Sequence, residues 1–288
     1  MTGKTRRLGK ASGFFGPYLA HVAVAAAILM LCHSAWSQAR GNGGRIESPD
    51  AANPIMDEPQ STTGPAALDL EALRAALRTV RCGVLGAETS DGRVMVVGTI
   101  AASRRENIVA TILRDYAPGQ QAEDAVRYGA PALCEPLSVL EPLRRTNAAA
   151  ATPVSIRLEA QGTPLRAGQS LVLDIAAPDF PAHLQVDYFT TDGNVVHLLP
   201  NPMETSSRVE PRAVRHLGDR KSGGRFWTIG PPFGDELLVV VASALPLFTT
   251  PRPEAETAAD YLPELKRVLD AAGPGALADA RFIATEAW

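Results

Sequence analysis

The clearest hairpin signal in the chain is the stretch HLQVDYFTTDGNVVHLL, residues 183–199. Two runs of strand-forming residues in it flank Asp192-Gly193, a dipeptide typical of the two-residue turns of β-hairpins. Such a turn also determines which residues lie opposite each other on the two strands. The expected cross-strand pairs are Tyr188 with His197 and Val186 with Leu199. The stretch therefore predicts an antiparallel hairpin within a β domain.

Further strands are expected on both sides of this hairpin. Apolar and polar residues alternate over 154–158, and apolar runs predict strands over 170–175, 226–229 and 236–242. Several short strands separated by turn signals are typical of an antiparallel β-sandwich. We therefore expect a sandwich over residues 154–288.

This β domain is expected to close with a helix and a strand. Residues 281–285 predict a closing edge strand. Before them, Gly273-Pro274 ends a helix whose apolar face is formed by Tyr261, Leu262, Leu265, Val268 and Leu269.

Residues 67–144 alternate between helical and strand periods and predict a small α/β domain. The expected elements are a helix over 68–80, a hairpin with strands at 82–85 and 93–100, a helix over 108–116 after a capping box at 103–106, a strand over 124–128, and a last helix with Leu137, Leu140 and Leu143. We expect that last helix to pack on the core of the same domain. A linker at 145–153 joins it to the β domain, so the predicted fold class is α+β.

The first 39 residues have the three parts of a secretory signal peptide. Four basic residues come first, an apolar run follows at 20–32, and Ser37-Gln38-Ala39 is a cleavage signature. The next segment, 40–66, is rich in Gly, Pro, Ser and Asp and predicts a disordered linker. We expect cleavage after Ala39 and a periplasmic protein. Two alternatives stay open, an uncleaved helix that anchors the chain in the inner membrane and a lipoprotein attached at Cys32.

The net charge and the cysteine content indicate the class of partner and the state of the cysteines. The whole chain has 28 Lys and Arg against 31 Asp and Glu, and cleavage of the four basic residues leaves 24 against 31, a net charge of about −7. This balance argues against a nucleic-acid partner. Two cysteines remain after cleavage, Cys82 and Cys134, and an oxidising compartment favours a disulfide between them. The alternatives are two buried free thiols or part of a metal site.

One segment stands out as basic against this acidic background. Its cationic residues are Arg208, Arg212, Arg215, Arg220, Lys221 and Arg225. They predict a face that binds an anionic envelope ligand or a partner protein. The alternative is a solvated loop between strands, with Phe226 and Trp227 in the core.

No catalytic motif is present in the sequence. We find no P-loop, dinucleotide-binding glycine motif, kinase motif or nucleophile elbow. We interpret His183, His197 and His216 as surface or strand-edge residues, and the sequence around Asp187 and Asp192 does not indicate a paired-carboxylate site. We therefore expect no catalytic residue, no metal and no cofactor.

Two parts of the chain resemble known families. Residues 155–250 resemble an uncharacterised bacterial family of β-sandwich domains, often found C-terminal to serine/threonine kinases and caspase-like proteases. The similar blocks are 168–173, 184–189, 192–201 and 229–238. Residues 82–128 are similar to a BON-type domain through DGRVMVVGTI at 91–100. The first resemblance implies an accessory or ligand-sensing module, and the second implies affinity for membrane or cell-wall components without catalysis.

These features together predict a non-catalytic cell-envelope protein that acts as an interaction or ligand-sensing module. Its expected partner is an envelope protein or an anionic envelope ligand. Two other functions stay open, a membrane-anchored structural or accessory component of an envelope complex and an unrecognised envelope hydrolase.

Overall fold

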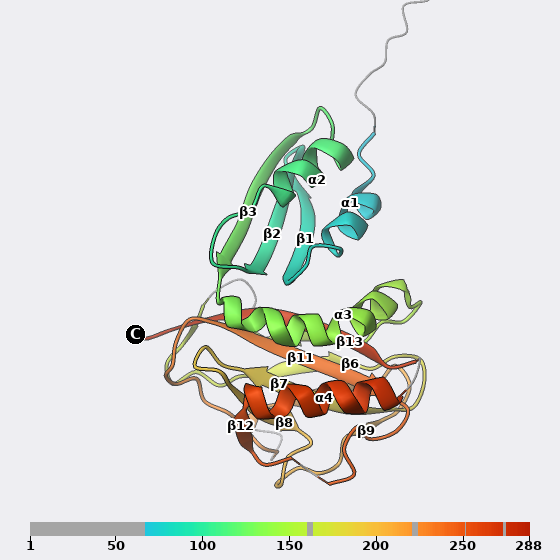
Figure 1. Ribbon diagram of the computed structural model, residues 1–288, viewed down its shortest axis with the longest axis vertical. Helices are drawn as coiled ribbons and strands as arrows, with labels where there is room; N and C mark the ends of the chain where they lie inside the picture. Colours follow the sequence, from blue (N-terminus) through green and yellow to red (C-terminus); the bar gives the residue numbers. More distant parts are fainter. Residues whose placement is uncertain (1–66, 160–163, 221–223, 251, 273–274) are drawn as a thin grey trace, which may run out of the picture. The chain divides into compact units, whose positions relative to one another are not determined.

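The computed structural model describes residues 67–288, apart from 160–163, 221–223, 251 and 273–274 (Figure 1). The expected signal peptide at 1–39 and linker at 40–66 lie outside the described residues, as does Lys221 of the basic segment.

The N-terminal part is a three-stranded sheet with two helices on one face. Its elements are α1 (Leu70–Leu77), β1 (Gly83–Ser90), β2 (Arg93–Ala101), α2 (Ile108–Tyr116) and β3 (Gln121–Gly129). Strands β1 and β2 are antiparallel, whereas β2 and β3 are parallel. Leu73 and Leu77 of α1 and Val109 of α2 pack against the apolar side of the sheet. The predicted order of helix, hairpin, helix and strand is confirmed.

The two helices of this part begin differently. The side chain of Asp69 accepts the backbone N–H of Ala72 at 2.9 Å and so caps the first turn of α1. The capping box predicted at 103–106 is wrong, because α2 begins only after Asn107 and has no side-chain hydrogen bond at its N-cap.

The third helix extends further than predicted and packs elsewhere. After a 3₁₀ turn, η1 (Pro131–Leu133), α3 runs over Cys134–Ala149 and enters the segment expected to be a linker. Leu137 and Leu140 lie in a core with the C-terminal strands and not with α1 and α2, which corrects the expectation of a shared N-terminal core. Asn147 then turns the chain, because its side-chain amide exchanges two hydrogen bonds of 2.9 Å with the backbone of Val154.

The described residues of the C-terminal part form two sheets and the helix α4. Its elements are β4 (Ser155–Leu158), β5 (Leu165–Arg166), β6 (Leu173–Ala176), β7 (Ala182–Phe189), β8 (Asn194–Leu199), β9 (Arg208–Val209), β10 (Val214–Leu217), β11 (Asp235–Ser243), β12 (Ala255–Thr257), α4 (Ala258–Ala272) and β13 (Leu277–Glu286). One sheet has the order β10-β6-β4, and the other has the order β12-β8-β7-β11-β13-β5, with β9 paired to β7.

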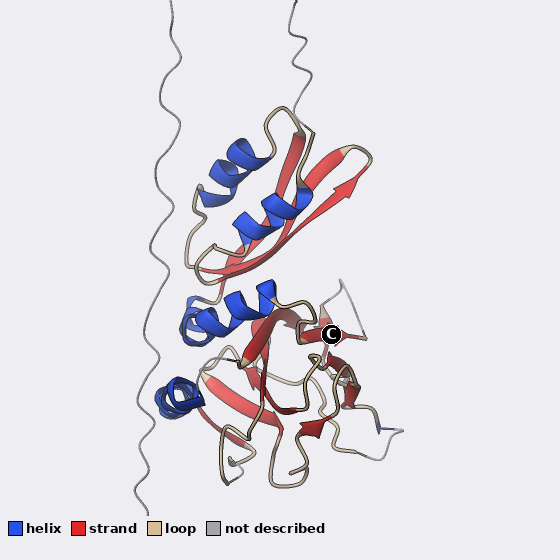
Figure 2. Cartoon of the chain, turned by 90° about the vertical axis from the view of Figure 1, so that its right-hand side faces the viewer, coloured by secondary structure: helices blue, strands red, loops and turns tan. Residues whose placement is uncertain are grey.

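Strand β11 is buried on both faces and separates two cores. Leu237, Val239 and Val241 contact the core formed with α3 and α4, which lie along one face of the larger sheet (Figure 2). Leu238 and Val240 point the other way, into a core that also contains residues of the smaller sheet. This continuous apolar run is typical of a strand covered on both sides. Helices and mixed sheets together confirm an α+β chain, while the sandwich arrangement stays a prediction.

Two predicted strands differ in the structure. Residues 226–229 form no named strand, and Thr228 makes an isolated bridge to Ser170. The closing strand is longer than 281–285 and lies at the end of the larger sheet, since β13 pairs with β11 along most of its length and the two-residue strand β5 covers its other side only at Thr285 and Glu286. Ala278 and Ala280, in the part of β13 before residue 281, are buried in the core formed with α3 and α4.

The hairpin at 183–199 is confirmed, but only part of its register is right. Val186 pairs with Leu199 as predicted, whereas His197 lies opposite Asp187 and not Tyr188. The loop is one residue longer than a two-residue turn, because the backbone N–H of Thr190 donates to the carbonyl of Asn194 at 3.0 Å. An irregularity between Val186 and Asp187 then restores the predicted register.

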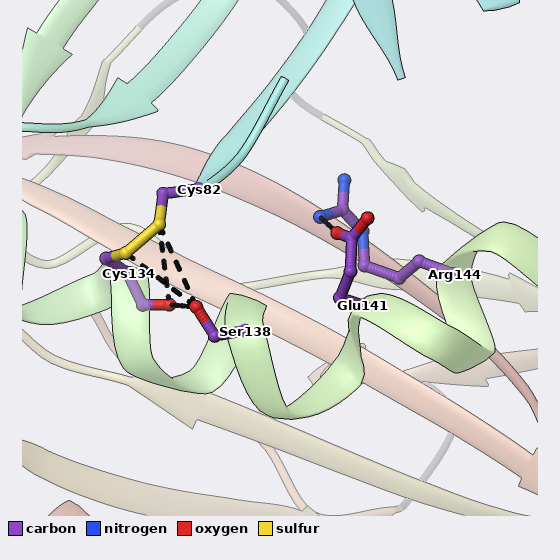
Figure 3. Close-up of a disulfide and its surroundings, with 5 residues drawn as sticks. All are labelled: Cys82, Cys134, Ser138, Glu141 and Arg144. Carbon is purple, nitrogen blue, oxygen red and sulfur yellow. Dashed lines mark hydrogen bonds and ion pairs between the residues drawn. A yellow bond between two sulfur atoms is a disulfide. The ribbon is translucent and has the colours of Figure 1, made fainter. Parts of the chain in front are cut away.

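Cys82 and Cys134 form a disulfide (Figure 3). It ties the residue before β1 to the first residue of α3. A second contact joins the same two elements, since the Arg144 guanidinium donates to the carbonyl of Gly83 at 3.0 Å. The disulfide therefore attaches the N-terminal sheet to the helix that packs on the C-terminal core.

We expect replacement of both cysteines (Cys82→Ser with Cys134→Ser) to lower the free energy of unfolding by about 4 kcal/mol, because the open chain gains loop entropy. Urea unfolding under non-reducing conditions measures this loss. Reductant should bring the wild type to the same midpoint and leave the double variant unchanged. Equal midpoints for the non-reduced wild type and the double variant would contradict the prediction.

Candidate functional site

A fully buried carboxylate–imidazole pair lies at the corrected hairpin register. Asp187 on β7 and His197 on β8 face each other, with 2.7 Å between Asp187 Oδ1 and His197 Nδ1. Gln185 Nε2 also donates to Asp187 Oδ1 at 2.7 Å, and the Tyr261 hydroxyl donates to Oδ2 at 2.6 Å. Both carboxylate oxygens thus have donors, as a buried charge requires.

A second carboxylate lies on the other side of the imidazole ring. His197 Nε2 is 3.0 Å from Glu256 Oε1 on the short strand β12. Arg252 holds the same carboxylate with two contacts, one of them from Nε at 2.7 Å. We call Gln185, Asp187, His197, Arg252, Glu256 and Tyr261 the His197 network.

The His197 network carries balanced charges when the imidazole is doubly protonated. Only an imidazolium can donate from both ring nitrogens, and each nitrogen of His197 faces a carboxylate. Burial by itself lowers the pKa of His197, but hydrogen bonds and charges from Asp187 and Glu256 outweigh burial, and the pKa is raised. Two cations, His197 and Arg252, then offset two anions.

The pKa shifts of Glu256 and Tyr261 agree with a doubly protonated His197. Burial raises the pKa of Glu256, but hydrogen bonds from Arg252 and His197 outweigh burial and lower it overall. Burial and the charge of Asp187 raise the pKa of Tyr261 well above its usual range, so its hydroxyl stays a donor.

Aromatic contacts connect the His197 network to the segment after β11. The Tyr261 ring meets the His197 ring edge-on, with 4.7 Å between centroids. The Arg252 guanidinium lies over the rings of Phe248 and Tyr261, at 5.3 and 5.7 Å from their centroids. The described residues of the segment 244–253 are therefore held at Phe248 and Arg252 by both an ion pair and ring contacts.

An open groove of about 960 Å³ lies between this segment and α4. We call it the α4 groove, and its main apolar residues are Phe180, Pro181, Leu245, Leu247, Phe248 and Val268. Leu245 is 76% exposed. The charged residues of the groove have partners of opposite sign, since Arg252 pairs with Glu256 and Arg267 with Glu264. The groove thus offers an apolar surface whose rim charges are neutralised.

The residues predicted to bind anions do not form a cluster of free charges. Glutamates pair with three of the five described arginines, as Arg208 with Glu210, Arg215 with Glu204 and Arg225 with Glu254. Arg220 lies over the Phe226 ring and donates to Thr228 Oγ1 at 3.1 Å. Arg212 occupies a turn before β10 with φ of 59°. Glu204 and Glu254 lie outside the basic segment, so its local composition overstates its charge.

The interpretation of the histidines needs one correction. His197 is fully buried and not at the surface, because the longer loop places it opposite Asp187. His216 is exposed beside Asp174, and His183 is half-buried with Nδ1 3.2 Å from Ser207 Oγ.

Within the described ranges, no His, Cys, Asp and Glu side chains form a group of three that could hold a metal ion. Among the same residues, no helix is long and apolar enough to cross a membrane.

Sequence reasoning missed Arg252 and Glu256 and treated Tyr261 only as an apolar helix residue. Strand β12 has three residues, too few for a periodic signal. The sequence at the end of this strand does contain a usable signal for the start of a helix, because Thr257 and Asp260 have the spacing of a capping box. Thr257 Oγ1 accepts the N–H of Asp260 at 3.1 Å, and this pattern marks the start of α4 next to Glu256.

We expect the stability of the wild type to fall as pH rises through the raised pKa of His197. The unfolded chain has an ordinary histidine pKa of about 6.5, so the contribution of the network is complete below that value and disappears as folded His197 loses its proton. His197→Gln should be about 3–5 kcal/mol less stable at pH 6 and should lack this decline.

Urea unfolding between pH 5.5 and 9 measures both effects, and the difference between the profiles of the wild type and His197→Gln isolates the contribution of this side chain. Parallel pH profiles for the wild type and His197→Gln would refute the assignment.

Comparisons with known proteins reach only part of the chain. Residues 165–246, less than a third of it, match the model of a domain of unknown function (DUF4384). No curated protein matches. Among solved structures, similarity is found to the Salmonella enterica SafA pilin in complex with the SafB chaperone, at 13% identity and a TM-score of 0.21, over 48% of this chain and 57% of that one. That score is too low to establish a shared fold. The family match confirms that an uncharacterised domain occupies this region, which includes Asp187 and His197 and ends before Glu256.

Proposed function

We propose that this chain is an exported, non-catalytic module of the cell envelope that binds an apolar segment of a partner protein in the α4 groove. The observation that carries the proposal is the groove itself, a hollow of about 960 Å³ lined mainly by apolar side chains. Leu245 is largely exposed there beside Leu247 and Phe248. Contiguous exposed apolar surface of this kind marks binding sites in soluble proteins.

Charge pairing favours a protein segment over an anionic ligand. Recognition of phosphate or acidic glycans needs donors that are free to reach the ligand. Arg252 and Arg267 at the groove pair with glutamates, and so do Arg208, Arg215 and Arg225 of the basic segment. An apolar segment of a partner protein needs no free donors, because it binds by burying its side chains against the groove.

The geometry of His197 supports a role without catalysis. A general base must reach a proton of its substrate. Both ring nitrogens of His197 are engaged by Asp187 and Glu256, and the ring is fully buried. The network therefore holds strands β7, β8 and β12 together and leaves no nitrogen for a bound molecule.

Export rests on the signal features of residues 1–39 and is supported by the disulfide, which persists in oxidising compartments. The BON-type resemblance of residues 82–128 points to the same compartment, the periplasm. We further propose that the two C-terminal sheets pack as a sandwich, since Leu173 and Ile175 of one share a core with Val186 and Val240 of the other.

Peptides selected from a random library against the folded protein should be rich in apolar residues. Leu245→Glu should weaken their binding more than tenfold, because burial of a leucine contributes about 1.5–3 kcal/mol. Met203→Glu is the matched control, since Met203 is 71% exposed and lies outside the groove. Fluorescence anisotropy measures both affinities.

Two results would contradict the proposal. One is equal binding of the selected peptides to the wild type and Leu245→Glu. The other is selection of acidic peptides whose binding depends on Arg212 and Arg220, which would favour an anionic ligand.

A further inference from the structure

We infer that His197 makes binding in the α4 groove dependent on pH, because its second proton fixes the Glu256–Arg252 pair at the groove wall. The inference rests on the proposed function and adds a means of regulation to it. It starts from the position of Arg252, which belongs both to the His197 network and to the groove.

His197 is faced by ionisable or charged groups from three elements. Asp187 on β7 faces Nδ1, Glu256 on β12 faces Nε2, and Tyr261 on α4 contacts the ring edge-on. Arg252, in the segment before β12, acts on the ring through Glu256. The backbone N–H of His197 donates to the carbonyl of Glu254 at 2.9 Å, so the imidazole remains next to β12 in either protonation state.

Loss of one proton affects the two carboxylates unequally. A neutral imidazole has a single N–H, and the other nitrogen presents a lone pair to a carboxylate within hydrogen-bond distance. Asp187 has two further donors, Gln185 and Tyr261, and lies fully inside the core. The proton therefore stays on Nδ1, toward Asp187, and Glu256 loses its donor at Nε2.

Glu256 is also the group that is able to move. Its side chain lies near the surface, with 12% exposure, on a three-residue strand at the edge of the larger sheet. Repulsion from the bare nitrogen moves the carboxylate outward together with Arg252, and Arg252 then leaves its place over Phe248 and Tyr261. Because Phe248 and Arg252 line the groove, this movement alters the groove wall. Affinity is therefore high at acidic pH and falls as pH rises through the deprotonation of His197.

The test uses 1-N-phenylnaphthylamine, an apolar fluorescent probe that is uncharged in this range, titrated into the full chain between pH 5 and 9. We expect wild-type affinity to fall about fivefold or more across a single transition above pH 6.5. Glu256→Gln should bind at the weaker, high-pH level throughout, because Gln cannot hold Arg252 by charge. Glu254→Gln, two residues before Glu256 and with its side chain paired to Arg225, should behave as the wild type.

The experiment distinguishes a failure of the pH dependence from a failure of the proposed function. Constant wild-type affinity from pH 5 to 9, with binding still weakened by Leu245→Glu, overturns the pH dependence and leaves the groove as the binding site. No probe binding at any pH overturns the proposed function and this inference with it. If Glu256→Gln does not fold, NMR of the wild type decides, because the exchange-protected Arg252 Nε–H signal should be lost over the same pH range, and its persistence at pH 9 overturns the inference.

Discussion

The position of His197 between Asp187 and Glu256 is the interaction on which our account of this protein depends. It joins a central strand, β7, to its neighbour β8 and to the edge strand β12, and through Tyr261 it reaches α4. Charges are expensive to bury unless each has a partner and its hydrogen bonds are satisfied. Here two carboxylates offset one imidazolium and one guanidinium, so each charge of the network has a partner of opposite sign.

The α4 groove follows from that arrangement. Glu256 lies two residues before α4, and Arg252 lies near the end of the segment that forms the groove wall opposite the helix. The apolar residues of α4 pack in the same core as one face of β11, whose side chains alternate between the two cores. The larger sheet, the helix attached to it through the charge network, and the segment before β12 together form this recess, whose lining is mainly apolar. Our proposal of a binding function rests on that apolar lining.

Much of the fold could be predicted from local patterns, and the site could not. The apolar runs at 183–199 and 236–242 are long enough to give their strands, and the helix at 261–269 follows from its spacing. The pairing of Asp187 with His197 depends on one extra loop residue and a compensating irregularity, which turn chemistry alone does not reveal. Glu256 lies on a strand of three residues, and the glutamates that pair with Arg215 and Arg225 lie 11 and 29 residues away from them in the sequence, outside the basic segment. These contacts join residues of separate elements, so neither composition nor periodicity predicts which residues pair.

The protonation of His197 is the central claim, and ¹⁵N NMR of its imidazole tests it most directly. At pH 6.5 an ordinary histidine is about half neutral. We predict that the doubly protonated form of His197, in which each ring nitrogen donates to a carboxylate, is the major species at that pH, with His197→Gln used to assign the signals. A neutral tautomer at His197 with one bare nitrogen at pH 6.5 would contradict the charge-balanced network.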